Sequence, residues 1–176
     1  MKKVIIALAT LIATVASYGQ GTVQFNNRLT ASGIDAKILS GGVGISDAAF
    51  KAQLYAGPEG SALSALKAVP GTTSFRTGAG AGYISPIDVS IPGIAAGAKA
   101  TIVVRAYNGA TYETSTSFGT SNPITITLGG AGSPPGPGAE LVGLTGFSVA
   151  GAVIPEPSTI ALGALGAAAL LLRRRK

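Results

Sequence analysis

The residues of this chain that are able to do acid–base or nucleophilic chemistry are few. Its 176 residues include no His and no Cys, which removes the Ser-His-Asp relay, thiol nucleophiles and most transition-metal ligand sets. Between the two ends of the chain there remain six carboxylates and one Ser-x-x-Lys spacing. The carboxylates are Asp35, Asp47, Glu59, Asp88, Glu113 and Glu140, and the spacing is formed by Ser64 and Lys67.

None of these groups forms a recognisable catalytic motif. Glycoside hydrolysis needs two carboxylates about 5 to 10 Å apart, but the acids are scattered over predicted turns and strand ends, without any Trp. Ser64 and Lys67 lie in a predicted loop without the partner motifs of a Ser-Lys dyad. The glycine-rich residues 78–82 lack the spacing and the Lys-Ser/Thr pair of a phosphate loop, and no D-x-D-x-D-G run favours calcium. We therefore predict no catalytic, cofactor-binding or metal-binding residue, and expect no enzyme.

The C-terminal residues 155–176 carry a stronger signal. Pro155, Glu156 and Pro157 precede an apolar run over residues 160–172, and the chain ends in four cations, which are Arg173, Arg174, Arg175 and Lys176. With an N-cap at Ser158 or Thr159, the run predicts a helix over residues 158–172. Such a helix rises about 22 Å, which is short of the ~30 Å hydrocarbon core of a bilayer.

The predicted helix of this tail is either a membrane segment or a helix buried in the core of the protein. Snorkelling cations and local thinning make up the missing length, and the basic cluster 173–176 is expected on the cytoplasmic side. The alternative is a buried core helix with a basic C-terminus, because apolar runs of 10 to 14 residues are typical of such helices. Four consecutive cations exceed what a helix dipole requires, so we favour the membrane.

The sequence from Ile154 to Lys176 resembles the PEP-CTERM sorting domain of Gram-negative bacterial envelope proteins. In that family an integral-membrane exosortase recognises the P-E-P motif and processes the tail outside the inner membrane. The resemblance implies that Pro155, Glu156 and Pro157 are recognised as substrate, that exosortase and the inner membrane are partners, and that the mature protein resides in the cell envelope or outside the cell. Four further phrases resemble secreted PEP-CTERM proteins without adding an activity; they begin at Gln20, Ala52, Phe75 and Ser121.

The N-terminal residues 1–19 predict a secretory signal peptide. Lys2 and Lys3 precede an apolar stretch over residues 4–16, which is the order of a signal's charged and hydrophobic regions. Cleavage between Gly19 and Gln20 is favoured because a strand pattern starts there, and cleavage after Ser17 is the alternative. A first buried helix is the structural alternative for the whole segment.

The net charge of +6 does not predict a nucleic-acid partner. The excess of cations belongs to the two ends, since residues 20–154 contain seven cations and six acids. The exported part therefore lacks the basic surface that a phosphate backbone requires.

Residues 20–150 predict one all-β domain. Short runs rich in β-branched and aromatic residues alternate between turn formers, which favours an antiparallel β-sandwich of about eight short strands, flanked by the N-terminal signal helix and the C-terminal hydrophobic helix. Residues 129–138 form a Pro/Gly-rich loop, residues 151–154 a spacer, and Asn108-Gly109 predicts a hairpin turn. The expected strands are residues 22–26, 50–56, 72–76, 84–90, 100–107, 112–117, 124–128 and 144–149. In the strand 100–107 one face is expected to carry Thr101, Val103, Arg105 and Tyr107, and the other Ile102, Val104 and Ala106.

Two functions remain open for this domain. The first is a structural protein of the cell envelope or extracellular matrix. The second is a module that binds extracellular polysaccharide through tyrosine rings, although tyrosines in strands are more often packed than exposed. The candidate stacking residues are Tyr55, Tyr83, Tyr107 and Tyr112.

Overall fold

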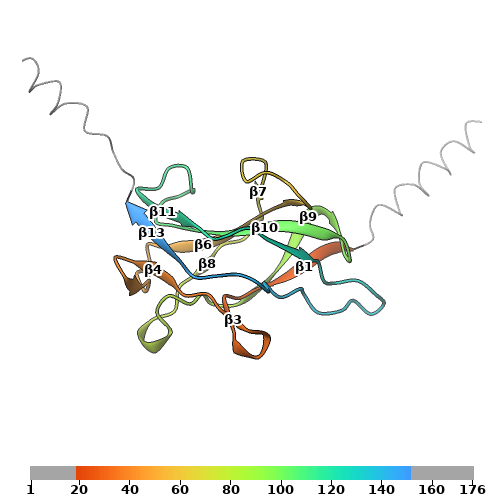
Figure 1. Cartoon of the computed structure of the whole chain (residues 1–176), viewed down its shortest axis with the longest axis horizontal. Coiled ribbons are helices and arrows are strands. Elements are labelled where there is room, and N and C mark those ends of the chain that lie inside the picture. Colours follow the sequence, from red (N-terminus) through yellow and green to blue (C-terminus); the bar gives the residue numbers. More distant parts are fainter. Residues whose placement is uncertain (1–18, 152–176) are drawn as a thin grey trace, which may run out of the picture.

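The computed structural model describes residues 19–151. Residues 1–18 of the predicted signal peptide 1–19 lie outside the described residues. So do all residues from 152 onward, which include the predicted sorting tail 155–176 with its predicted helix 158–172. Within residues 19–151 there are two short 3-10 helices, η1 (Thr30–Ser32) and η2 (Gly78–Gly80), and no helix that has the length and apolarity to cross a membrane. The rest is strands and loops (Figure 1).

The strands form one large sheet and two small ones. The nine-stranded sheet has the order β5-β4-β13-β11-β10-β6-β7, with β12 paired to β10 and β8 paired to β6; β1 pairs with β9, and β2 pairs with β3. The strands are β1 (Gln20–Phe25), β2 (Arg28–Leu29), β3 (Ile34–Asp35), β4 (Ile38–Ser40), β5 (Val43–Gly44), β6 (Lys51–Pro58), β7 (Lys67–Ala68), β8 (Thr73–Ser74), β9 (Ile87–Ala95), β10 (Lys99–Tyr107), β11 (Ser117–Thr120), β12 (Ile124–Thr127) and β13 (Phe147–Gly151).

The centre of the large sheet is the antiparallel pair β6 and β10, in register from Ala100 opposite Pro58 to Tyr107 opposite Lys51. Their sequences alternate, so successive side chains point to opposite faces. Ile102, Val104 and Leu54 join the main core, while Val103 and Tyr55 form a smaller cluster on the other face. The two faces predicted for residues 101–107 are confirmed.

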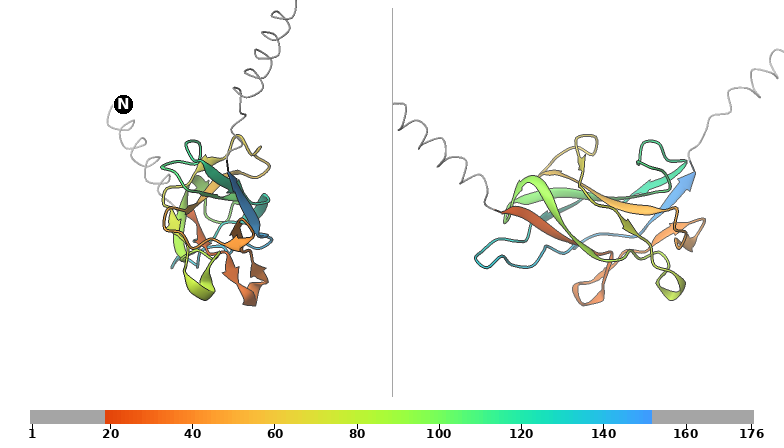
Figure 2. Two further views of the ribbon diagram at one scale, coloured as in Figure 1. Left: turned by 90° about the vertical axis from the view of Figure 1, so that its left-hand side faces the viewer. Right: turned by 180° about the vertical axis from the view of Figure 1, so that it is seen from behind.

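The main core lies between β6–β10 and the β1–β9 pair (Figure 2). Val23 and Phe25 from β1 and Ile91 from β9 are at most 1% exposed and belong to the same cluster as Leu54 and Ile102. Burial of each such side chain contributes about 1.5–3 kcal/mol. The all-β prediction is confirmed by this arrangement.

The finer prediction of an antiparallel sandwich is not confirmed. The large sheet curls, and β13 pairs with β4 in parallel, with Phe147 opposite Ile38 and Val149 opposite Ser40. The predicted strand 112–117 is wrong, because residues 108–116 form a loop and β11 begins only at Ser117. Asn108 does start the connection between β10 and β11, but the connection is longer than a two-residue turn.

The two ends of the described chain lie at opposite ends of the domain (Figure 1). β1 starts next to Gly19 at one end of the long axis, and β13 reaches Gly151 at the other. The loop 129–138 projects near the β1 end, whereas β4, β11 and β13 gather at the opposite end.

Candidate functional site

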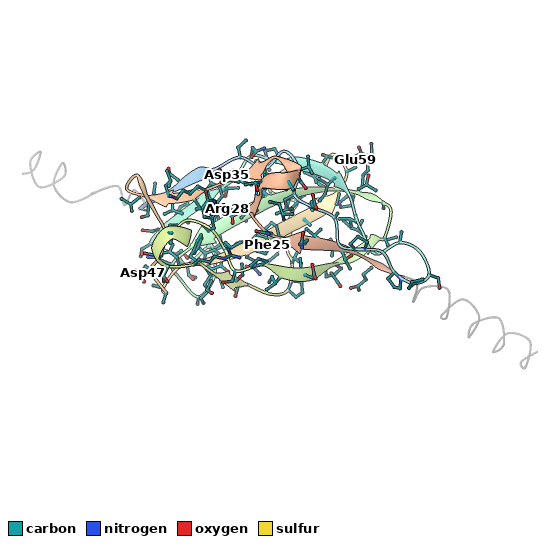
Figure 3. All side chains as sticks on the ribbon, turned by 90° about the horizontal axis from the view of Figure 1, so that it is seen from below. Phe25, Arg28, Asp35, Asp47 and Glu59 are labelled. Carbon is teal, nitrogen blue, oxygen red and sulfur yellow. The ribbon has the colours of Figure 1, made fainter. Side chains whose placement is uncertain are left out.

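Three of the six carboxylates of the sequence analysis lie well apart from one another. Asp35, Asp47 and Glu59 are spread over the molecule, with Asp47 at the end where β13 finishes and Glu59 towards the other (Figure 3). The Tyr83 hydroxyl donates to Asp35 Oδ1 at 2.6 Å, the Ala49 N–H to Asp47 Oδ1 at 2.9 Å, and Lys99 Nζ lies 3.4 Å from Glu59. These three acids therefore act as a hydrogen-bond acceptor, a turn cap and an ion-pair partner.

The other three acids come from different elements, with Asp88 on β9, Glu113 in loop 108–116 and Glu140 ahead of β13. Residues 19–151 contain no cluster of three or more acids that could hold a metal ion. Ser64 lies in the loop after β6 and Lys67 begins β7, with no hydrogen bond between them in the described part of the chain. The structure does not bring the Ser-x-x-Lys spacing together as a dyad.

The glycine-rich residues 78–82 have a structural task. Gly82 accepts hydrogen bonds on its carbonyl from the Ile38 N–H at 2.9 Å and from Asn27 Nδ2 at 3.1 Å, and its own N–H donates to Ile45 at 2.7 Å. The segment is therefore a turn that ties β4 to the end of β1.

Three of the four candidate stacking tyrosines meet on the outer face of β6 and β10. Tyr55 comes from β6, Tyr107 from β10 and Tyr112 from loop 108–116. The Tyr112 ring centroid lies 6.1 Å from that of Tyr55, 6.1 Å from that of Tyr107 and 5.2 Å from that of Phe118 on β11, each in an edge arrangement. Tyr83 lies elsewhere, under the guanidinium of Arg28.

Arg105 is the residue of this cluster to which sequence reasoning gave no role. Its guanidinium carbon lies 4.0 Å from the Tyr55 ring centroid and 4.4 Å from that of Tyr112, so that the cation is held between two aromatic rings. Its Nε is buried and has no hydrogen-bond partner among the described residues. Side chains alternate along β10, so Arg105 lies on the same face as Val103 and Tyr107. This alternation is the sequence signal that could have assigned Arg105 to the cluster.

Loop 108–116 holds Tyr112 in place. Asn108 Oδ1 accepts from the Ser117 N–H at 3.0 Å, and Ser115 Oγ donates to the Thr111 carbonyl at 2.6 Å. The Tyr112 hydroxyl is 2.8 Å from Thr120 Oγ1. These side-chain bonds satisfy the loop backbone and compete with strand formation.

A groove of about 490 Å³ lies beside the tyrosines. Its lining includes Gln53, Tyr55, Lys67, Thr72, Tyr107 and Glu113. Tyr107 donates to Gln53 Oε1 at 2.7 Å. Burial raises the pKa of Tyr55, with Glu113 adding to the effect, and burial also raises the pKa of Tyr107. Both hydroxyls therefore stay neutral donors through the physiological range.

Tyr55 and Tyr107 are walls of this groove, not open platforms. They are 5% and 2% exposed, so their rings present no free face on which a sugar could stack. Phe118, at 36% exposure, is the most open aromatic ring of the cluster.

Comparison with protein families gives one match, to the PEP-CTERM protein-sorting motif over residues 153–176. The chain is a PEP-CTERM domain-containing protein. The motif makes it an exosortase-sorted, exported protein of the cell envelope or the extracellular space. No curated protein and no solved structure matches the chain.

The PEP-CTERM match includes Pro155, Glu156 and Pro157 and the basic cluster 173–176, whose individual roles stay predictions. At the other end of this PEP-CTERM protein, β1 begins at Gln20, the residue that follows the predicted cleavage site.

Proposed function

We propose that this PEP-CTERM protein is a structural component of the cell envelope or extracellular matrix, delivered by its tail. The observation that carries the proposal is the position of the sorting motif, which starts two residues after the end of β13 at Gly151. A domain with its own core thus reaches the sorting enzyme as a folded body. The separation of Asp35, Asp47 and Glu59 and the absence of His support a role without catalysis.

In this proposal each part of the tail has a task. Pro155, Glu156 and Pro157 are recognised by exosortase, the apolar residues 158–172 lie in the inner membrane before processing, and residues 173–176 hold the tail's end on the cytoplasmic side. The shortness of the apolar run relative to a ~30 Å hydrocarbon core favours a transient membrane stage.

The experiment is a triple substitution of the recognition residues. Pro155→Ala, Glu156→Ala and Pro157→Ala in one chain should leave an unprocessed, membrane-associated protein in an exosortase-bearing host. The matched control is a chain with Pro135→Ala, Pro137→Ala and Glu140→Ala, which removes the same residue types from the exposed loop 129–138 and the residues after it. Unchanged processing and fractionation of the triple variant, relative to the control, would contradict the proposal.

A second candidate function is binding of extracellular polysaccharide. The groove beside Tyr55 and Tyr107 favours it, because Lys67, Glu113 and Thr72 offer donors and acceptors at a wall of aromatic rings, which is the usual make-up of a small-ligand site. Its test is binding of the processed protein to envelope polysaccharides. Lys67→Ala and Glu113→Ala should weaken binding, whereas Lys99→Ala and Glu59→Ala, an exposed pair elsewhere, should not. If the processed protein binds none of the polysaccharides, the structural role is the one that remains of the two candidate functions.

A further inference from the structure

One end of the large sheet brings exposed apolar side chains next to the last strand. Across the sheet, Lys51 lies opposite Tyr107, Tyr107 opposite Phe118, and Phe118 opposite Ala150 of β13. One residue earlier in β13, Val149 lies opposite Ser40, which in turn lies opposite Val43. Val149 and Ala150 are consecutive in β13 and point to opposite faces of the sheet. Val43 and Phe118 therefore lie on opposite faces, on either side of the point from which the chain continues into the sorting tail.

These two side chains are unusually open. In the described part of the chain the large hydrophobic residues classed as exposed are Val43 (71%), Leu63 (47%), Phe118 (36%) and Val142 (56%). Tyr112, 5.2 Å from Phe118 between ring centroids, enlarges the apolar surface at this end. We name Val43 on one face, and Tyr112 and Phe118 on the other, the terminal apolar surface, because together they border this end of the sheet.

Leu63 and Val142 lie away from this end. Leu63 follows Pro58, which pairs with Ala100, and Ala100 is about 24 Å along β10 from Tyr107 at ~3.4 Å per residue. Val142 precedes Gly143, which lies against Ile124, and Ile124 pairs with Ile102, about 17 Å along β10 from Tyr107. Both residues are thus natural controls for the terminal apolar surface.

The number of residues between Gly151 and the proposed membrane segment limits how far this end of the domain can lie from the membrane. Residues 152–157 reach at most about 20 Å when extended, and the proposed membrane segment starts directly after them. The opposite end of the domain, with Gly19, points away (Figure 1). While the tail is in the membrane, the end with Val43 and Phe118 is therefore tethered to the lipid headgroups.

Charge does not oppose the contact. Lys51 belongs to the same row of residues as Phe118, and the exposed Asp47 lies at the same end of the domain (Figure 3). Lys37, whose side chain lies beside Gly44 of β5, and Glu113, which follows Tyr112, add one charge of each sign. Apolar and aromatic burial therefore decides the interaction. Aromatic rings are favoured at the membrane–water interface.

We propose that the terminal apolar surface rests on the outer leaflet of the inner membrane before the tail is processed. This inference rests on the membrane stage of the proposed function. A few partly buried side chains bind a bilayer weakly by themselves, but a short tether raises the effective concentration to the order of mM. The contact orients the domain with its long axis leading away from the membrane.

The absence of Cys from the chain provides a direct test. Single-cysteine full-length chains, Val43→Cys, Phe118→Cys, Leu63→Cys and Val142→Cys, are labelled with a fluorophore and reconstituted in phosphatidylethanolamine and phosphatidylglycerol vesicles that carry a headgroup-region quencher. Labels at positions 43 and 118 should be quenched several-fold more than labels at 63 and 142. Circular dichroism confirms that all four variants keep the native fold.

Two results would overturn the proposal in distinguishable ways. Equal quenching at the four positions, with the protein floating with the vesicles, would overturn the terminal contact and leave the membrane stage intact. A full-length chain that does not float with the vesicles would overturn both.

Discussion

The guanidinium of Arg105 is held between two rings, with its carbon 4.0 Å from the Tyr55 ring centroid and 4.4 Å from that of Tyr112. The first ring belongs to the central strand β6 and the second to loop 108–116. Arg105 therefore fastens the loop to the outer face of the sheet.

A double-mutant cycle of Arg105→Gln and Tyr112→Leu measures this fastening. We expect a coupling energy of about 1 kcal/mol, because a partly desolvated cation–π contact contributes about 0.5–2 kcal/mol. The matched cycle is Arg28→Gln with Tyr83→Leu, where the exposed Arg28 lies 4.6 Å from the ring centroid and the coupling should be smaller. Urea unfolding of the four chains in each cycle gives both values. A larger coupling at Arg28 would contradict this order.

Asn27 is a second fastening point, and its loss should be more costly. The side chain is 0% exposed; its Nδ2 donates to the carbonyls of Ala36 and Gly82, and its Oδ1 accepts from the Ile84 N–H. Asn27→Ala removes the side-chain partners of the Ala36 carbonyl and the Ile84 N–H, at about 1–3 kcal/mol for each unsatisfied group, whereas the Gly82 carbonyl keeps its bond from the Ile38 N–H. We expect the free energy of unfolding to fall by about 3 kcal/mol or more.

The control for Asn27 is Asn122. Asn122 also bonds three groups, the Gly143 carbonyl and the Thr145 N–H and hydroxyl, but at an exposed place. Because water replaces lost partners there, Asn122→Ala should cost only about 1 kcal/mol. The free energy of unfolding of both variants is measured by urea unfolding. Equal losses would show that the burial of Asn27 does not determine the cost of its removal.

Gly82 and Gly33 separate backbone strain from crowding. Both have a positive φ, 88° and 73°, where an alanine costs about 1–2 kcal/mol. A Cβ at Gly82 would lie 2.6 Å from Lys37 Cγ and 2.9 Å from the Ile38 carbonyl oxygen, whereas nothing lies within 4 Å at Gly33. Gly82→Ala should therefore destabilise the protein by about 1–3 kcal/mol more than Gly33→Ala. Equal melting temperatures of the two variants would show that crowding around Gly82 adds no cost to the substitution.

Tyr83 should titrate late in alkali. Its hydrogen bond to Asp35 raises the pKa of the hydroxyl above the ordinary 10.0, with burial adding to the effect and Arg28 opposing it. The raised pKa stabilises the fold below about pH 10, and this contribution is lost as pH rises through the folded-state pKa. Asp35→Asn should lower the pKa of Tyr83, as read from tyrosinate absorbance. Tyr83→Phe identifies the transition, and an unchanged Tyr83 titration in Asp35→Asn would contradict the assignment.

The sequence predicted those strands whose formation depends on the alternation of their own residues. The alternation in residues 100–107 predicted β10 and its two faces, since Ile102 and Val104 are apolar and β-branched on the core side. Residues 112–117 misled because their composition is typical of a strand, while the side chains of Asn108 and Ser115 bind the loop backbone in its place. The parallel pairing of Val149 with Ser40 had no local signal, because it joins residues more than a hundred positions apart in the sequence.

The sequence predicted only part of the candidate site, because contacts between distant segments leave no local pattern. Tyr55 and Tyr107 come together because β6 and β10 are neighbours in the sheet. The sequence did not predict this pairing, because β7, β8 and β9 lie between the two strands in the chain. Tyr83 follows the η2 turn, whose bonds to Ile38 and Asn27 carry it to Asp35 and Arg28, and no sequence pattern encodes that turn's position.

The interior position of β13, between β4 and β11, sets an order of events during export. In the export proposed above, strands arrive outside the membrane from the N-terminus onward, so the large sheet cannot close until its last strand has crossed. The sorting motif follows that strand after a single residue. We therefore expect completion of the fold and arrival of the tail at the membrane to occur at nearly the same step of translocation. A chain that stalls before this step would present neither a finished domain nor a signal to sort it.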